Sequence, residues 1–352
     1  MNIINISGRK IGIGHPPYVI AEMSGNHNGD IGRALALIEA ASRAGVDAVK
    51  LQTYTANTIT IEHDSPEFII DRGLWSGRTL YSLYQEAHTP WDWHSTIFER
   101  AAELGLTIFS SPFDDTAVDF LEGLSVPAYK IASFELLDLP LVRRVAATCK
   151  PLIMSTGMAS ELEVGEALEA ARSEGASEIV LLHCVSGYPT PAREANLKMI
   201  ETLAHRFLVP VGLSDHTLGS VVPSAAVALG ASVIEKHFTL ARDDGGPDAA
   251  FSLEPDELAE LVVNCRLTWD ALGDNDFKRS PSEIENLRFR RSLYVVEDVG
   301  VGEVFTTKNV RSIRPGFGLP PKYLPEILGS RSNLNLKRGT ALQLKHVSRD
   351  NE

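Results

Sequence analysis

Two histidines follow neighbouring segments that are rich in aliphatic and β-branched residues. His216 comes shortly after VGLS, and His237 ends VIEKH. If these segments are adjacent strands of a barrel, both imidazoles reach one face and can bind a metal ion that keeps positions open for water and substrate. Glu235 shares the strand side of His237 and could orient a ligand or a bound water. Two core histidines satisfied by hydrogen bonds are the alternative, but the nearby carboxylate favours a metal site.

Two lysines interrupt apolar segments of the chain. Lys50 lies in AVKLQ, and Lys130 lies in YKIAS. A buried ammonium group without an anionic partner is strongly unfavourable, so we expect both lysines to meet a phosphate or a carboxylate. That anion is either a ligand or, as the alternative, a buried acid of the protein such as Glu22 or Glu135.

Further polar residues stand at or just beyond the ends of predicted strands. Glu22 ends YVIAE, immediately before a segment that contains the turn-forming NHNG, and is a candidate general acid or base, or a group that orients a hydroxyl. Serine hydroxyls are donors that suit anionic oxygens, although serine is also common at strand ends and helix caps. The other candidates for substrate binding at these ends are Asn26, Gln52, Ser110, Ser133, Ser186, Ser214 and Asp215.

Short β-like segments alternate with amphipathic stretches, several of which end in glycine. This alternation is typical of repeated βα units on a parallel sheet. The segments are YVIAE, AVKLQ, TIFSS, AYKIAS, LIMST, IVLLHC, VGLS and VIEKH, which begin at Tyr18, Ala48, Thr107, Ala128, Leu152, Ile179, Val211 and Val233. Repetition of this unit up to about residue 273 predicts a (β/α)8 TIM barrel. A doubly wound open sheet is disfavoured because no glycine-rich phosphate loop follows the first strand.

One connection is too long to be a simple loop. Residues 53–90 separate two predicted strands, so we expect them to fold over the top of the barrel as a lid. Trp75, Tyr81 and Tyr84 either contact substrate or pack the insertion on itself. The domain prediction is a catalytic barrel at 1–275, a polar linker at 276–290 and a small all-β domain at 291–352.

Composition excludes several classes of protein. The formal net charge of −13 disfavours binding to nucleic acid or anionic membranes, so an anion site must gather its cations locally. No segment of about 18 apolar residues predicts a membrane span. The three cysteines, Cys149, Cys184 and Cys265, are an odd number in a chain of 352 residues, which favours a reducing compartment. We therefore predict a cytoplasmic protein.

Several segments together resemble the sialic acid synthase family. In the barrel they are AEMSGNHNG, DAVKLQTY, FSSPFD, YKIAS, MSTGMAS, PVGLSDHTLG, and VIEKHFTL with GGPDAAFSLEP; in the tail, FRRSLYVVEDVGVGEVFTTKNVRSIRPGFGL resembles the antifreeze-like (SAF) domain of those enzymes. Within the family, GLWSGRTLYSLYQEAHTPWDWH and RPGFGLPPKYL are most similar to the pseudaminic acid synthase branch. The resemblance spans essentially the whole barrel and the tail.

This resemblance implies a metal-dependent condensation of phosphoenolpyruvate with 2,4-diacetamido-2,4,6-trideoxy-L-altrose, which yields pseudaminic acid and phosphate. It implies that His216 and His237 bind Mn²⁺, Mg²⁺ or Co²⁺. Glu22 would bind sugar hydroxyls or move protons, and Glu235 would position the attacking water. The groups that would hold phosphate and carboxylate are Lys50, Lys130, Ser110, Ser133, Ser186 and Ser214.

The resemblance also implies a domain-swapped homodimer. Arg314, in RSIRPGFG, matches an arginine that reaches from one subunit into the barrel of the other and contacts an acyl group of the sugar. Two local departures from the family are Gly25, where relatives often have alanine or isoleucine, and CVSGYP, which puts the phosphate contact of Ser186 in question.

Rival functions stay open on the sequence alone. An N-acetylneuraminate or legionaminate synthase would act on a mannose-type acylated sugar. A Schiff-base aldolase would use a barrel lysine such as Lys130 and need no metal. A carbohydrate- or ice-binding tail on an inert barrel is disfavoured by the lysines and histidines at the strand ends.

Overall fold

The computed structural model describes residues 3–274 and 276–348. The chain divides into two compact units, Met1–Gly273 and Asp274–Glu352, and each is described by itself. The predicted domain limits at residues 1, 275 and 352 lie outside the described residues.

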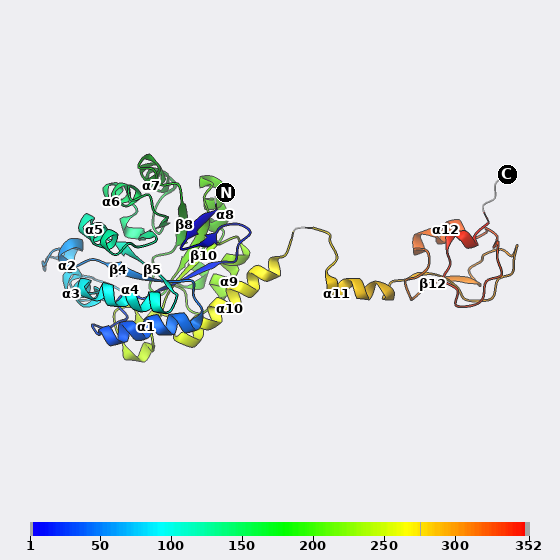
Figure 1. The fold of residues 1–352 in the computed structure, drawn as a ribbon, viewed down its shortest axis with the longest axis horizontal. Coiled ribbons are helices and arrows are strands. Elements are labelled where there is room, and N and C mark those ends of the chain that lie inside the picture. The colour runs from blue at the N-terminus through cyan, green and yellow to red at the C-terminus, as the bar shows by residue number, and fades with distance from the viewer. Residues whose placement is uncertain (1–2, 275, 349–352) are drawn as a thin grey trace. The chain divides into compact units, whose positions relative to one another are not determined.

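The first unit is a closed barrel of parallel strands (Figure 1). Its strands are β3 (Tyr18–Glu22), β4 (Ala48–Thr53), β5 (Thr107–Pro112), β6 (Tyr129–Ile131), β7 (Leu152–Ser155), β8 (Ile179–Cys184), β9 (Val211–Asp215) and β10 (Val233–His237). The last strand closes the barrel against the first, with Val233 opposite Tyr18 and His237 opposite Glu22. The predicted TIM barrel is confirmed, and each predicted β-like segment overlaps one of these strands, although β4, β5 and β9 extend one residue beyond their segments.

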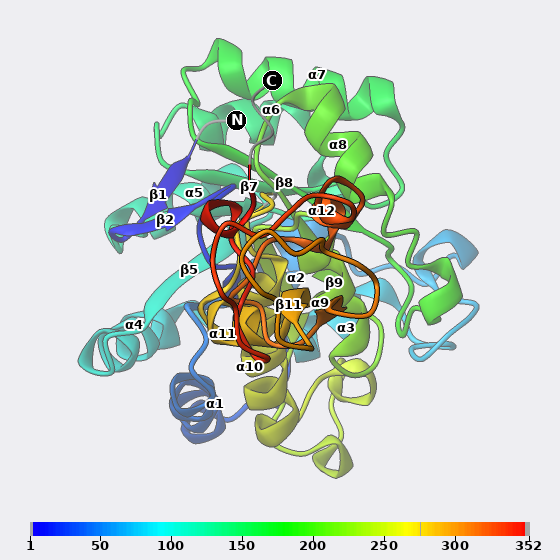
Figure 2. The ribbon, with the colours of Figure 1, turned by 90° about the vertical axis from the view of Figure 1, so that its right-hand side faces the viewer.

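Helices surround the barrel, and Figure 2 shows α6, α7 and α8 on one side of the strands, with α1 and α4 on another. Each of these helices packs its apolar face on the outside of the sheet. The main helices of this unit are α1 (Ile31–Ala44), α4 (His94–Glu103), α5 (Asp115–Gly123), α6 (Leu139–Ala146), α7 (Glu161–Ser173), α8 (Met199–Phe207), α9 (Val221–Ala228) and α10 (Pro255–Leu272).

Alternate residues of each strand face opposite sides of the barrel wall. In β5, Phe109 belongs to the apolar cluster inside the barrel, whereas Ile108 belongs to the cluster under the helices. The inner cluster also includes Ile4, Ile6 and Ile11 of a hairpin formed by β1 (Ile4–Ile6) and β2 (Arg9–Ile11). The interior is therefore apolar where the strands begin, which leaves its polar residues near the carboxyl ends.

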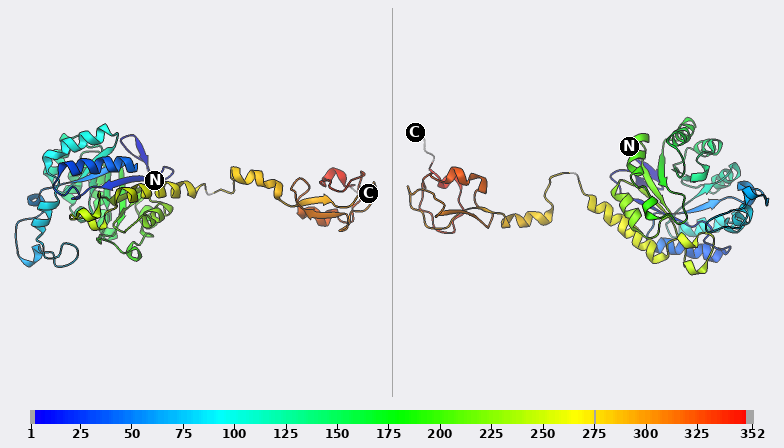
Figure 3. Two further views of the ribbon diagram at one scale, coloured as in Figure 1. Left: turned by 90° about the horizontal axis from the view of Figure 1, so that it is seen from below. Right: turned by 180° about the vertical axis from the view of Figure 1, so that it is seen from behind.

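The long connection after β4 folds as an insertion, which stands out from the barrel as a light-blue loop in the left view of Figure 3. It contains α2 (Ala56–Ile59) and α3 (Leu80–Ala87), and Ile69 and Thr79 form an antiparallel bridge between them. Trp75 donates a hydrogen bond to the carbonyl of Pro247 in the loop after β10. The Tyr81 hydroxyl instead bonds Asn57 within the insertion, so only part of the insertion contacts other loops of the barrel top.

The second unit has a small apolar core of its own. Strand β11 (Ser292–Val295) pairs antiparallel with β12 (Val310–Ile313), and their Leu293 and Val310 pack with Phe305 and Leu336. The rest of the predicted all-β domain is less regular: Val304, Ala341 and Val347 form isolated bridges instead of strands, and a 3-10 turn occupies Leu344–His346. Short helices α11 (Pro281–Ile284), in the predicted linker, and α12 (Leu324–Ile327) complete this unit. Within residues 3–274 and 276–348, no helix has both the length and the apolar character needed to cross a membrane.

Candidate active site

Four charged side chains meet inside the barrel at the carboxyl ends of its strands. Lys50 Nζ lies 2.8 Å from Glu22 Oε2 and 3.2 Å from Glu235 Oε2, and Lys130 Nζ lies 3.5 Å from Glu235 Oε1. All four residues are buried. Both predicted lysines therefore have carboxylate partners from the protein itself, one of which, Glu22, was the expected alternative. We call Glu22, Lys50, Lys130 and Glu235 the inner charge cluster.

Burial and mutual charge push the pKa values of this cluster apart. Burial raises the pKa of Glu22, and the charge of Lys50 only partly opposes this. Burial also favours a neutral Glu235, but the charges of Lys130 and Lys50 outweigh it and lower its pKa to about 2. Burial lowers the pKa of Lys130, whereas for Lys50 the two glutamates outweigh burial and the pKa is raised. Groups with opposed shifts in one small site are typical of catalytic centres.

The inner charge cluster is not saturated with hydrogen bonds. Glu22 Oε1 accepts from Gln52 at 3.1 Å and Glu235 Oε1 accepts from Ser214 at 3.0 Å, but the Oε2 atom of each glutamate has no hydrogen-bonding donor. The Lys50 ammonium is the charged neighbour of both Oε2 atoms, at 2.8 Å from that of Glu22 and 3.2 Å from that of Glu235. Ser155 Oγ, at the end of β7, is buried without a partner as well. Such atoms inside a native protein call for a ligand.

Two predicted serines converge on a glycine beside this cluster. The Gly157 amide donates to Ser133 Oγ at 3.2 Å. A Cβ atom at residue 157 would lie 2.7 Å from Ser133 Oγ and 2.5 Å from Ser186 Oγ. Only glycine leaves room there, so Ser133 and Ser186 line one small polar recess, as a site for an anionic oxygen requires.

The two predicted histidines lie together at the ends of β9 and β10. Their ring centroids are 5.3 Å apart. His216 donates from Nδ1 to the carbonyl of Val185 at 3.0 Å, and its Nε2 takes no part in that bond. His237 Nδ1 is buried without a hydrogen-bond partner, and burial together with His216 lowers the pKa of His237 far below its usual value. The expected alternative, two histidines satisfied by core hydrogen bonds, does not describe His237.

These features suit a metal ion. A metal ligand must be a neutral imidazole with a free nitrogen, often oriented by a backbone carbonyl on the other nitrogen. His216 meets the second condition and His237 the first. Residues 3–274 and 276–348 contain no cluster of three or more histidine, cysteine or acidic ligands at metal-binding distances. The remaining ligands would therefore be water or substrate oxygens.

Aromatic rings form a wall beside the imidazoles. Tyr188 lies 4.5 Å from His216 between ring centroids, and Phe251 lies 5.0 Å from His237 and 5.2 Å from Tyr188. Trp75 of the insertion lies 5.6 Å from Tyr188. Trp75, one of three aromatic candidates in the insertion, thus belongs to the site wall. We call Trp75, Tyr188 and Phe251 the aromatic wall.

Two predicted substrate-binding residues, Ser110 and Asp215, face away from this interior, and a third, Asn26, leaves its buried Oδ1 without a hydrogen-bond partner. Ser110 faces the helices, where it bonds Thr53 at 2.6 Å, because the strand alternation turns Ser111 inward instead. Asp215 also faces outward and pairs with Lys236 at 2.5 Å. Asn26 donates from Nδ2 to the carbonyl of Phe238 and to Ser252, which makes it a clamp between two loops.

Ser111 and Ser155 lie on barrel strands near the inner charge cluster, although the sequence argument did not single them out as binding residues. Ser111 Oγ lies 3.5 Å from Lys50 Nζ, and the unpartnered Ser155 lies on the strand between those of Lys130 and Cys184. Each has another serine or threonine next to it in the sequence. Only the alternation of residues along the strand could have shown which of the two neighbours faces the barrel interior. Arg314 is exposed directly after β12 in the second unit, and its role remains a prediction.

Comparison with known proteins assigns the chain to a family. Residues 37–277 match the NeuB family, and residues 290–348 match the SAF domain. The chain belongs to the NeuB family. The predicted membership of the sialic acid synthase family with a terminal SAF domain is thereby confirmed.

Relatives of this NeuB-family chain match it along almost its whole length. It is 46% identical over 326 residues to a pseudaminic acid synthase of Campylobacter jejuni, covering 93% of this chain and 95% of that one. It is 43% identical over 335 residues to a pseudaminic acid synthase of Helicobacter pylori, covering 95% and 98%. A crystal structure of N-acetylneuraminic acid synthetase from Leptospira borgpetersenii, in complex with citrate, superposes with a TM-score of 0.74 at 32% identity, over 82% of this chain and 96% of that one.

Proposed function

We propose that the protein is a pseudaminic acid synthase. It condenses phosphoenolpyruvate with 2,4-diacetamido-2,4,6-trideoxy-L-altrose and water, and releases phosphate. The likeness to two enzymes of this name over nearly the full chain carries the proposal, since both are more similar to it than the N-acetylneuraminic acid synthetase is. A mannose-type sugar, as in N-acetylneuraminate or legionaminate synthesis, is the alternative substrate.

The chemistry forms one carbon–carbon bond and one carbon–oxygen bond to water, and it breaks the carbon–oxygen bond to phosphate. Carbon three of phosphoenolpyruvate attacks the sugar aldehyde, water adds to carbon two, and phosphate leaves. Lys50 and Lys130 hold the anionic groups of phosphoenolpyruvate, because this is where cations gather in a chain of net charge −13. Glu235 orients the attacking water, and Glu22 binds a sugar hydroxyl or moves a proton.

The remaining donors orient the same substrate. Ser133, Ser186 and the Gly157 region offer a recess for phosphate oxygens, with Ser155 as a further hydroxyl. Ser111 and Ser214 lie beside Lys50 and Glu235 and hold the carboxylate end. Ser110 has no part in this arrangement because its hydroxyl is engaged under the helices.

His216 and His237 would hold a divalent ion, which we propose to be Mn²⁺, Mg²⁺ or Co²⁺. When bound, such an ion supplies a Lewis acid that polarises the aldehyde oxygen. With two imidazoles as protein ligands, coordination positions would stay open for water and substrate. The free Nδ1 of His237 supports this assignment.

The assay that tests this function measures phosphate release. The protein is incubated with phosphoenolpyruvate and, in turn, the altrose-type diacetamido sugar and mannose-type acylated sugars, each with divalent cation and with excess chelator. We expect turnover of the altrose-type sugar, loss of turnover on chelation, and recovery with added cation. Faster turnover of a mannose-type sugar would replace the proposed substrate, and full activity after exhaustive chelation would contradict the role of metal.

One observation favours a second mechanism, that of a Schiff-base aldolase. Burial lowers the pKa of Lys130, which favours a neutral amine that can form an imine. A Schiff-base aldolase would be inactivated by borohydride in the presence of its carbonyl substrate. We expect no such trapping, since Lys130 lies against Glu235 and serves as a cation.

We further propose a cytoplasmic, domain-swapped homodimer, in which Arg314 of one subunit contacts an acyl group of the sugar in the barrel of the other. The free cysteines Cys149, Cys184 and Cys265 suit a reducing compartment. Truncation after about residue 285 would remove Arg314, and we expect a large loss of turnover. Full activity of the truncated chain would exclude the tail from the mechanism.

A further inference from the structure

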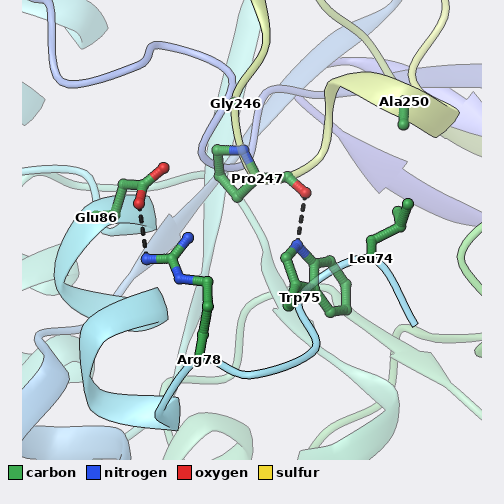
Figure 4. Close-up of a pocket in the computed structure, with 7 residues that line it drawn as sticks. All are labelled: Leu74, Trp75, Arg78, Glu86, Gly246, Pro247 and Ala250. Atoms are coloured by element: carbon green, nitrogen blue, oxygen red, sulfur yellow. Dashed lines mark hydrogen bonds and ion pairs between the residues drawn. The ribbon is translucent and has the colours of Figure 1, made fainter. Parts of the chain in front are cut away.

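A cavity of about 240 Å³ opens where the insertion meets the loop after β10 (Figure 4). Leu74 and Trp75 line it from the insertion, and Pro247 and Ala250 line it from the loop. A water molecule needs only roughly 10–15 Å³ of such space, so the cavity has room for a group of several heavy atoms. None of these four residues belongs to the inner charge cluster or binds the proposed metal.

The cavity adjoins the site through the aromatic wall. Trp75 lines the cavity and also contacts Tyr188, whose ring in turn contacts His216. Ala250 precedes Phe251, which contacts both Tyr188 and His237. A linear sugar held by its aldehyde near the imidazoles would therefore carry its later carbons past this wall and toward the cavity.

The lining of the cavity selects a neutral ligand group. In Figure 4, Arg78 and Glu86 lie on one side of Trp75 and Pro247, and Leu74 and Ala250 lie on the other. Arg78 Nη2 is 2.7 Å from Glu86 Oε2, so its charge is already compensated and the cavity offers no free cation to an anion. A guanidinium has five donors, which leaves Arg78 able to bond a carbonyl oxygen. An acylamino group has both parts required here, a methyl for the apolar side and an amide for the polar side.

Close packing holds the Pro247 wall in place. The Trp75 indole donates to the Pro247 carbonyl at 2.7 Å. On its other side Pro247 packs against Gly25, where an added Cβ would lie 2.8 Å from Pro247 Cγ. The next residue back, Gly246, has a φ of +113° and no space for a side chain beside Asn28. A preformed wall of this kind favours binding because little ordering is required.

We propose that this cavity is the subsite for the acylamino group farther from the aldehyde, the one on carbon four of a diacylated amino sugar. The proposal rests on the proposed function, and it names the part of the chain that distinguishes a diacylated sugar from a mono-acylated one. Trp75 is then both a wall of the site and a wall of the subsite.

The test compares two sugars in steady-state kinetics with phosphoenolpyruvate. They are the 2,4-diacetamido sugar and 2-acetamido-2,6-dideoxy-L-altrose, which has a hydroxyl at carbon four, and the measured quantity is the ratio of their kcat/KM values. Ala250→Leu fills the cavity and should lower the preference for the diacylated sugar about 10- to 100-fold, the range expected for a few buried groups. Leu74→Ala removes an apolar side chain from the cavity wall at a half-exposed position. It should lower the preference for the diacylated sugar about 10-fold.

The matched control is Ile61→Ala, on the same insertion but outside the cavity lining, where Ile61 is 57% exposed. This variant should keep the wild-type preference. If the mono-acylated sugar is not converted, its inhibition constant against the diacylated sugar replaces its kcat/KM. An unchanged preference in both cavity variants, or a wild-type enzyme that converts both sugars equally well, would overturn the subsite alone. A wild-type enzyme that converts neither sugar would overturn the subsite together with the proposed function.

Discussion

The barrel wall carries buried ion pairs on both of its sides, and the two differ in how completely they are satisfied. On the outer side, Lys236 donates to Asp215 and to the carbonyl of Thr217, and Asp215 also accepts from the Thr217 amide and hydroxyl at 3.0 Å. On the inner side, Glu22 and Glu235 each keep an oxygen without a hydrogen-bonding donor. The outer pair ties the ends of β9 and β10 together, whereas the inner charge cluster is the site that we propose for the substrate.

Buried histidines show the same contrast. His94, under the helices, donates from Nδ1 to the Pro90 carbonyl at 3.2 Å and accepts at Nε2 from Thr53 at 2.9 Å. His237, inside the barrel, is also buried but leaves Nδ1 without a partner. A saturated polar group is part of the scaffold, and an unsaturated one is available to a ligand. For these two histidines, hydrogen-bond satisfaction is a clearer difference than burial is.

The largest effect should follow from removing an inner imidazole. His237→Ala should lower turnover about 10³- to 10⁴-fold, because the chemical step loses several kcal/mol of charge stabilisation. The free energy of unfolding should change little, since no hydrogen bond of Nδ1 is lost. Calorimetric titration with Mn²⁺ gives a readout that is independent of activity. Undiminished metal binding by this variant would show that His237 is not a ligand.

Breaking the outer pair should affect stability instead. Lys236→Met should lower the free energy of unfolding by about 3–5 kcal/mol, because Asp215 is left as an uncompensated buried charge. Urea unfolding measures this, and the double variant Lys236→Met with Asp215→Leu should recover most of the loss. The exposed pair of Lys337 with Asp298 is the control, and Lys337→Met should produce no measurable change. If the free energy of unfolding of Lys236→Met equals that of the wild type, the outer pair does not stabilise the fold.

Two buried histidines that are not among the proposed metal ligands, His94 and His27, should make stability depend on pH. Burial lowers the pKa of His94 to about 4 and that of His27 likewise to about 4, against about 6.5 in the unfolded chain. Between pH 6.5 and 4 the unfolded state binds more protons, so stability is complete above pH 6.5 and declines as the pH falls toward 4. The loss should be roughly 1–3 kcal/mol for each histidine. Urea unfolding at several pH values should give a flatter profile for His94→Gln than for the wild type, and parallel profiles would contradict the assignment.

The smallest effect should distinguish neighbouring serines on opposite sides of the wall. Ser111→Ala should raise the KM for phosphoenolpyruvate about 5- to 10-fold, because a donor beside Lys50 is lost, which corresponds to about 1 kcal/mol. Ser110→Ala should leave this KM unchanged and lower stability slightly, since it breaks the bond to Thr53. The reverse result would mean that the strand alternation is assigned the wrong way round.

Much of the site was predictable because some residue types have few roles in such positions. Lys50 and Lys130 were identified because an ammonium group inside an apolar strand needs an anion, and both do meet carboxylates. His216 and His237 were predicted as metal ligands because each stands at the end of a strand; their rings do lie together, and their role as ligands stays a prediction. Ser110 and Asp215 were predicted to face the interior, but they face the helices. Parallel barrel strands are buried on both sides, so their sequence does not indicate which alternate residues face inward.

The sequence by itself determined the order of strands and helices, the second small unit and the types of residue that gather at the strand ends, because local periodicity and the cost of burying charge are properties of short segments. Only the tertiary structure decided which of two adjacent polar residues enters the barrel, which oxygens and nitrogens remain unpaired, and that Trp75 meets Tyr188 and Pro247 beside a cavity. Those outcomes depend on barrel closure and on contacts between residues far apart in the chain, which no local pattern encodes.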